Sequence, residues 1–112
     1  MFLVLWEFEV KPSCEQRFER VYGPGGDWDR LFRSDPNHAG TQLFRDLARP
    51  RVYLTMDHWR SKKSYEEFRQ ARKAEYKALD AASGNLTAYE RENGCYELVE
   101  TWTPDAANDV PL

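Results

Sequence analysis

Alternation of apolar and polar side chains predicts four strands in this chain. In residues 2–10 every second side chain is apolar, and the positions between them are apolar at first and acidic later. Residues 40–47, 51–59 and 95–102 repeat this period of two. Such alternation is typical of β-strands, and bulky side chains on both faces of residues 51–59 indicate that both faces are covered.

Helix signals fill the two long intervals between these strands. Ser13 and Gln16 form a capping box, and an apolar stripe follows until the glycines at 23–26 end the helix. Residues 27–32 predict a further short helical turn. The longest helix can begin at Ser61 or at Ser64, the latter with a capping box to Glu67, and Gly84 predicts its end near Ser83. Residues 86–92 could form one more short helix before the last strand.

The predicted order is therefore strand, helix, strand, strand, helix, strand. This βαββαβ order predicts an α+β, ferredoxin-like fold: an antiparallel four-stranded sheet with its helices on one face. The apolar side chains on the other face need a second cover, which predicts a homodimer whose sheets pack together. One domain is expected over residues 1–103, followed by a C-terminal tail over residues 104–112.

Composition excludes several classes of protein. The 112 residues suffice for one core, and 41% of them are hydrophobic and 31% charged, as in globular proteins. The net charge of −3 is spread along the chain, which predicts no nucleic-acid binding, and no apolar run approaches the ~18 residues of a membrane span. The spacing of Cys14 and Cys95 matches no metal site, so reduced thiols in a cytoplasmic protein are expected.

Several segments resemble the antibiotic biosynthesis monooxygenase family, a branch of the dimeric α+β barrel superfamily. They are residues 40–46, residues 53–59, and Ser61 leading to Tyr65 and Phe68. The resemblance implies a pocket between sheet and helices, near a Trp and a Tyr six residues later, and Trp59 and Tyr65 have this spacing. Quinone-forming members carry an Asn four residues before the Trp, where this chain has Thr55.

These comparisons define a set of candidate site residues. The expected catalytic residues are Trp59, which would stack on the substrate, and Tyr65 and Thr55, which would hold its oxygens. The expected substrate-binding residues share the strand face of Trp59 or the facing helix: Tyr53, Asp57, Arg72 and Tyr76. His38 and His58 are interpreted as structural. A polar strand face opposite aromatic side chains is typical of small-molecule pockets, which predicts that Trp59 borders one.

No cofactor and no metal are expected. The haem-degrading branch places a His about ten residues after the Trp, and this chain has Arg69 there. The resemblance thus implies a cofactor-independent monooxygenase that acts on a hydroxylated aromatic or polyketide-like ligand. The alternative is a non-catalytic dimeric module of the same fold that binds a small ligand or supports a partner. The sequence names neither the substrate nor the catalytic base.

Overall fold

A four-stranded sheet and four helices make up the chain in a computed structural model, which describes residues 1–104. Residues 105–112 of the predicted tail lie outside the described residues. The elements follow in this order: β1 (Phe2–Val10), α1 (Glu15–Tyr22), α2 (Asp27–Arg33), β2 (His38–Arg45), β3 (Val52–Trp59), α3 (Lys62–Ala71), α4 (Lys73–Ser83), the 3-10 turn η1 (Gly84–Leu86) and β4 (Thr87–Glu97).

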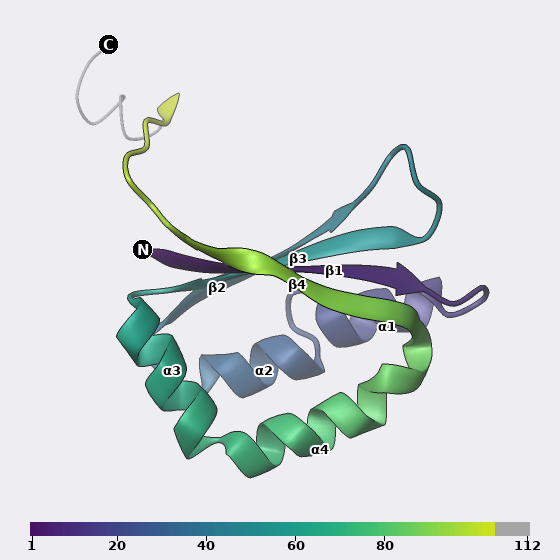
Figure 1. The fold of residues 1–112 in the computed structure, drawn as a ribbon, viewed down its shortest axis with the longest axis horizontal. Coiled ribbons are helices and arrows are strands. Elements are labelled where there is room, and N and C mark those ends of the chain that lie inside the picture. Colours follow the sequence, from purple (N-terminus) through teal and green to yellow (C-terminus); the bar gives the residue numbers. More distant parts are fainter. Residues whose placement is uncertain (105–112) are drawn as a thin grey trace.

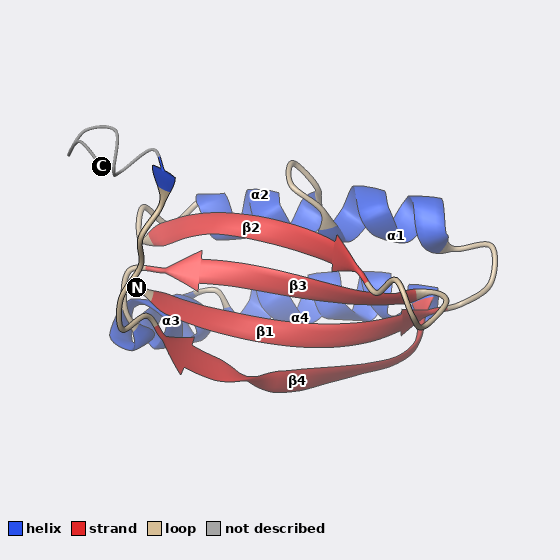
Figure 2. Cartoon of the chain, turned by 90° about the horizontal axis from the view of Figure 1, so that it is seen from above, coloured by secondary structure: helices blue, strands red, loops and turns tan. Residues whose placement is uncertain are grey.

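The sheet has the order β2-β3-β1-β4, and every neighbouring pair is antiparallel. All four helices lie on one face of this sheet, and the opposite face is open (Figures 1 and 2). The α+β, ferredoxin-like prediction is confirmed. No helix among residues 1–104 is long and apolar enough to cross a membrane.

The last strand differs from its prediction at both ends. It begins at Thr87 rather than at residue 95 and stops at Glu97, so residues 86–92 do not form a helix. The register against β1 shifts between Leu5–Gly94 and Trp6–Glu92, which leaves Asn93 without an opposite residue. The Asn93-Gly94 pair therefore forms a β-bulge within one strand, with Gly94 at φ +155°, rather than a turn before it.

The helices also differ in detail from the sequence pattern. Ser13 has a φ of +70° and lies outside α1, which begins after Cys14 without a side-chain cap. Ser61 is the N-cap of α3, with reciprocal hydrogen bonds to Ser64. The single long helix that was expected is divided at Arg72, whose φ of −110° and ψ of 27° are not helical.

The core lies between the helices and the sheet. Side chains at alternate positions of β1 and β3 point into it, and aromatic rings from α1, α2 and α3 pack on them. Its most deeply buried members are Val4, Val10, Phe18, Tyr53, Trp59 and Phe68. Aromatic pairs join the helices to the sheet, for example Phe18 with Tyr53, at 5.0 Å between ring centroids.

The buried carboxylate of Glu7 lies on the open face of the sheet. It is 3% exposed and accepts hydrogen bonds from Arg49 (3.0 Å), Tyr89 (2.7 Å) and Arg91 (2.9 Å). The hydrogen bond from Arg49, followed by that from Tyr89, lowers the pKa of Glu7 from 4.5 to about 2. The ionised form of Glu7 therefore stabilises the fold.

We expect Glu7→Gln to flatten the acid limb of the stability curve. Because the folded pKa of Glu7 is depressed, its contribution is present above about pH 4.5 and is lost as the pH falls toward 2. The melting temperature of the native protein should drop more steeply across this window than that of the variant. The control is Glu66→Gln, at an exposed position of α3. Parallel curves for native protein and Glu7→Gln would refute the assignment.

Candidate functional site

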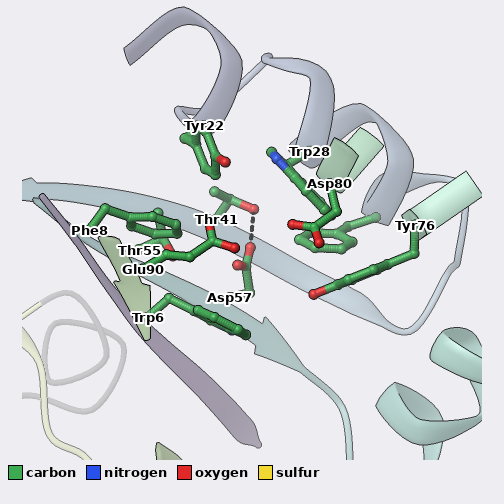
Figure 3. A pocket seen from close by; sticks show the side chains of 11 residues that line it. Trp6, Phe8, Tyr22, Trp28, Thr41, Thr55, Asp57, Tyr76, Asp80 and Glu90 are labelled. Carbon is green, nitrogen blue, oxygen red and sulfur yellow. Dashed lines mark hydrogen bonds between the residues drawn. The ribbon is translucent and has the colours of Figure 1, made fainter. Parts of the chain in front are cut away.

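A narrow cavity lies between the helix-facing side of the sheet and the helices (Figure 3). Its volume is about 450 Å³ when the part that opens to solvent is counted. Six aromatic rings, two threonines and three carboxyl groups line it: Trp6, Phe8, Tyr22, Trp28, Phe32, Tyr76, Thr41, Thr55, Asp57, Asp80 and Glu90.

The floor of the cavity comes from three adjacent strands. Trp6 of β1 lies opposite Thr55 of β3, and Asp57 of β3 lies opposite Thr41 of β2. These positions share one face because side chains alternate along each strand. The two threonines are short among large aromatic side chains, so they leave space above the sheet.

A buried hydroxyl in α4 fixes two rings of the helical wall. The Tyr22 hydroxyl (3.2 Å) and Trp28 Nε1 (3.3 Å) both donate to Ser83 Oγ, which in turn donates to the carbonyl of Leu79 (2.7 Å). Ser83 is 3% exposed. The polar groups of both rings are thus satisfied outside the cavity, and what they offer a ligand is aromatic surface.

Tyr76 forms another part of the wall. Its ring packs edge-on against Trp28, at 4.9 Å between centroids, and the guanidinium of Arg69 lies 4.2 Å from its ring centroid. Burial raises the pKa of Tyr76, so its hydroxyl stays protonated at neutral pH. Tyr76 also borders a second hollow between residues of α3 and α4, of about 890 Å³ counting the part that opens to solvent, where Arg69 and Tyr65 lie.

Asp57 places a carboxylate in the floor. Its Oδ1 accepts a hydrogen bond from Thr41 Oγ1 (2.7 Å), and His38 Nε2 is 3.2 Å from that hydroxyl and 3.7 Å from Oδ1. Thr41 has one proton, which it donates to Asp57, so it accepts from His38 if the Nε2 of His38 carries hydrogen. Figure 3 shows the Thr41–Asp57 bond in the cavity.

Two further carboxyl groups line the cavity, Asp80 from α4 and Glu90 from β4. Burial raises the pKa of Glu90, and the negative charge of Asp80 and hydrogen bonding with it raise this pKa further. Although Glu90 as a whole residue is exposed, its carboxyl group points into the cavity (Figure 3). A carboxyl group with a raised pKa inside an aromatic cavity is a candidate proton acceptor.

The structure brings together three of the residues expected from sequence. Thr55, Asp57 and Tyr76 all line the cavity. Thr55 is 4% exposed and lies at the centre of the floor, between Trp6 on β1 and Leu43 on β2. Its hydroxyl is therefore placed to donate a hydrogen bond to a ligand oxygen.

The structure corrects the expectation that Trp59 borders a pocket. Its ring is fully buried in the core. It packs against the rings of Phe32, His38 and Phe68, at centroid distances of 5.7, 5.1 and 4.9 Å. Trp59 does not line the cavity, and its Nε1 has no hydrogen-bond partner within residues 1–104. Since α2 and α3 cover this end of β3, no room is left beside the indole.

Tyr65, Tyr53 and Arg72 also lie away from the cavity lining. The Tyr65 hydroxyl accepts a hydrogen bond from Arg69 (2.7 Å) at the outer hollow. The Tyr53 hydroxyl lies 2.6 Å from Glu19 and 3.0 Å from Glu15, and burial raises the pKa of Tyr53 to about 12. Arg72 forms an ion pair with Glu75 where α3 meets α4.

Sequence reasoning missed Trp6, Trp28, Asp80 and Glu90 as site residues. Trp6 is on the apolar face of residues 2–10 and Trp28 is in the short turn at residues 27–32, but inward-facing aromatic residues are usually core. The spacing of Tyr76 and Asp80, four residues apart in one helix, was a usable signal, because such residues share a face. Glu90 could not be found, since its segment was not recognised as a strand.

Comparisons with solved structures agree with this architecture. A proposed antibiotic biosynthesis monooxygenase from Bordetella bronchiseptica has 20% sequence identity and a TM-score of 0.71, with 88% of this chain and 97% of that chain covered. SnoaB, a cofactor-independent oxygenase from Streptomyces nogalater, has 15% identity and a TM-score of 0.71, covering 89% and 94%. A protein from Caulobacter crescentus has 22% identity and a TM-score of 0.71, covering 88% and 90%.

The sequence itself was compared with curated proteins and with family models. The search of curated proteins found no match. The model of the antibiotic biosynthesis monooxygenase family matches residues 1–82, which include the first three strands, all of α3 and most of α4. The chain therefore belongs to the antibiotic biosynthesis monooxygenase family.

Proposed function

We propose that this protein is a cofactor-independent monooxygenase that oxidises a hydroxylated aromatic molecule to a quinone. The observation that carries the proposal is the aromatic cavity with the Glu90 carboxyl group inside it, whose pKa burial raises. Membership of the family and the shared fold with SnoaB, a cofactor-independent oxygenase, support the same assignment.

The reaction needs a proton acceptor and a substrate ring that the protein holds in place. Glu90 takes the phenolic proton, and the phenolate gives one electron to O₂, which leaves a phenoxyl radical and superoxide. The two radicals combine at the ring carbon para to the oxygen, and protonated Glu90 returns its proton to the peroxide. Loss of water, which includes the hydrogen of that ring carbon, leaves the quinone, so one phenol and one O₂ give one quinone and one water.

Each wall of the cavity has a part in this scheme. Trp6 and Trp28 hold the ring between sheet and helices, and the hydroxyl of Thr55 binds a substrate oxygen. Burial and the neighbouring Asp80 raise the pKa of Glu90, so that Glu90 is a stronger base than an exposed carboxylate. Holding the ring in place and excluding water both favour electron transfer within the cavity over reactions in solution.

Oxygen uptake tests the proposal. The purified chain, with EDTA present and no flavin or haem added, is mixed with 1-naphthol and with 1,5-dihydroxynaphthalene, and O₂ consumption and quinone absorbance are followed together. The expected result is one O₂ consumed per quinone formed, well above the rate without protein. If either compound binds but O₂ uptake stays at the protein-free rate, the enzyme assignment fails.

A second candidate is a dimeric module that binds an aromatic ligand without changing it. Two observations favour it: position 55 holds Thr rather than Asn, and Trp59 is buried away from the cavity. Binding without O₂ uptake in the experiment above would support this candidate over the enzyme.

We further propose that the protein is a homodimer joined through the open face of the sheet. This face carries half-buried apolar side chains on both central strands, and more exposed ones at its edges: Leu3, Leu5, Leu54, Met56, Phe44 and Tyr96. All four helices lie on the other face, so no helix within residues 1–104 covers these side chains (Figure 2). Apolar patches of this kind usually mark an interface.

Light scattering during gel filtration should give about twice the chain mass of 13.2 kDa. Met56→Asp should give the monomer mass, because Met56 lies opposite Leu5 in the middle of the open face. The control is Glu66→Lys on the helical side, which should stay a dimer. A native protein that elutes as a monomer at micromolar concentration would contradict the dimer.

We also place the protein in the cytoplasm. Cys14 and Cys95 are both free thiols, and reducing compartments keep thiols in this state. Recovery of the protein from the periplasmic or secreted fraction of cells would refute this.

A further inference from the structure

The cavity is lined by acidic side chains and by no basic ones within the described residues. Its lining contains three carboxyl groups, from Asp57, Asp80 and Glu90, and no lysine, arginine or histidine among the described residues. These acids come from three different elements, β3, α4 and β4. A neutral or anionic aromatic ligand would bury this negative charge without an opposite charge beside it, which is unfavourable in a site of low dielectric constant.

Asp57 is the most deeply buried of these three carboxylates. The residue is 8% exposed, and its Oδ1 accepts from Thr41. Its Oδ2 has no hydrogen-bond donor within residues 1–104. Oδ2 is not fully enclosed by protein atoms. The Asp57 side chain points into the cavity (Figure 3).

Two basic side chains, His38 and Arg69, lie close to the cavity but outside its lining. His38 lies 3.7 Å from Asp57 Oδ1, but on the side of Thr41 and packed edge-on against Trp59. Arg69 lies against Tyr76 and binds the Tyr65 hydroxyl at the outer hollow. Neither residue lines the cavity, although His38 lies within ion-pair distance of Asp57 Oδ1.

The walls themselves suit a positive charge. Trp28 and Tyr76 meet edge-on at 4.9 Å, and Trp6 and Phe8 stack at 6.3 Å on the sheet side. Aromatic faces attract cations through their quadrupoles, most strongly when water is excluded. Within residues 1–104, no group of three or more His, Cys, Asp or Glu side chains could hold a metal ion, whereas an organic cation needs no such group.

We propose that the natural ligand of this cavity is an aromatic molecule that carries a protonated amine, which Asp57 binds. The proposal rests on the proposed function in one respect, because it names the substrate class of the same cavity. The ammonium group would bind Asp57 Oδ2 beneath the rings of Trp6 and Tyr76, and the hydroxylated ring would extend toward Glu90. The positive charge would also stabilise the phenolate that the oxidation requires.

Three ligands of nearly equal size and different charge test the proposal: 1-naphthylmethylamine, 1-naphthalenemethanol and 1-naphthoic acid. Their dissociation constants are measured at pH 7 by isothermal titration calorimetry on the native protein. The ammonium compound should bind about ten-fold more tightly than the alcohol, and the carboxylate should bind most weakly. Equal affinities, tightest binding of the carboxylate, or no binding of any of the three would overturn the proposal.

Asp57→Asn supplies the residue-level test. Asn can still accept the hydrogen bond from Thr41, so the variant removes the charge and little else. It should weaken binding of the ammonium compound about ten-fold and leave binding of the alcohol within about two-fold. Glu67→Gln, which removes one exposed charge from α3, should change neither. Equal losses for amine and alcohol in Asp57→Asn would refute a charge-specific role.

These binding measurements separate this proposal from the enzyme assignment. Oxygen uptake with 1-naphthol and no preference for the amine would refute the cationic ligand and leave the oxygenase standing. A clear preference for the amine without any oxygen uptake would do the reverse.

Discussion

Trp59→Ala should lower the melting temperature by about 10–20 °C without removing a wall of the cavity. The indole is fully buried and packs against rings from α2, β2 and α3. Truncating a buried Trp to Ala typically costs about 3–5 kcal/mol of the free energy of unfolding. For a domain of this size that is a large part of a total of roughly 5–15 kcal/mol.

Two further variants make this result interpretable. Trp59→Phe keeps most of the ring and removes the Nε1 group that lacks a hydrogen-bond partner, so it should lose much less stability than the alanine variant. Trp6→Ala, at a half-buried position of the cavity floor, should abolish binding of 1-naphthol with a smaller loss of melting temperature. If Trp59→Ala melts like the native protein and loses ligand binding, then Trp59 contacts the ligand.

Glu90→Gln should reduce the rate of quinone formation by about 10²–10⁴-fold, because proton transfer by a positioned side chain contributes this much to catalysis. Gln keeps the size and polarity of the side chain but cannot take a proton at neutral pH. The binding of 1-naphthol, measured without turnover under anaerobic conditions, should change little. The loss should therefore appear in kcat rather than in KM.

The pH profile gives a second readout of Glu90. Since Glu90 must be ionised to accept the proton, the rate should fall as the pH decreases through its pKa, which burial and Asp80 raise. Asp80→Asn should move this limb to lower pH, because it removes the neighbouring negative charge. Glu97→Gln, at an exposed position of the same strand, is the matched control. An unchanged kcat in Glu90→Gln would exclude Glu90 as the base.

The central strands could be predicted from sequence because burial determines their pattern. β1 has the predicted bounds, and β3 differs by one residue, since both strands have neighbours on each side and helices above them. The start of β4 could not be predicted, because the side chains of this strand between Ala88 and Asn93 are all exposed. An exposed edge strand needs no apolar alternation, so the pattern gives no signal there.

The site was predicted in part for a related reason. Tyr53, Thr55, Asp57 and Trp59 do share the helix-facing side of β3, as their alternation predicts. Alternation does not say which part of a strand the helices cover closely. Phe32 of α2 and Phe68 of α3 fill the space over Trp59, whereas the space over Thr55 and Asp57 stays open. That difference depends on packing between distant segments.

The central claim is that an aromatic ligand binds between Trp6 and Trp28. The four tryptophans of the chain allow a direct test, because Trp6 and Trp28 line the cavity, Trp59 is in the core, and Trp102 is exposed near the end of the described chain. Each indole N–H signal in a ¹H–¹⁵N NMR spectrum can be assigned with a single Trp→Phe variant, and the protein is then titrated with 1-naphthol. The signals of Trp6 and Trp28 should shift together and saturate, while those of Trp59 and Trp102 move little. Saturable shifts centred on Trp59, with Trp6 and Trp28 unchanged, would contradict this account.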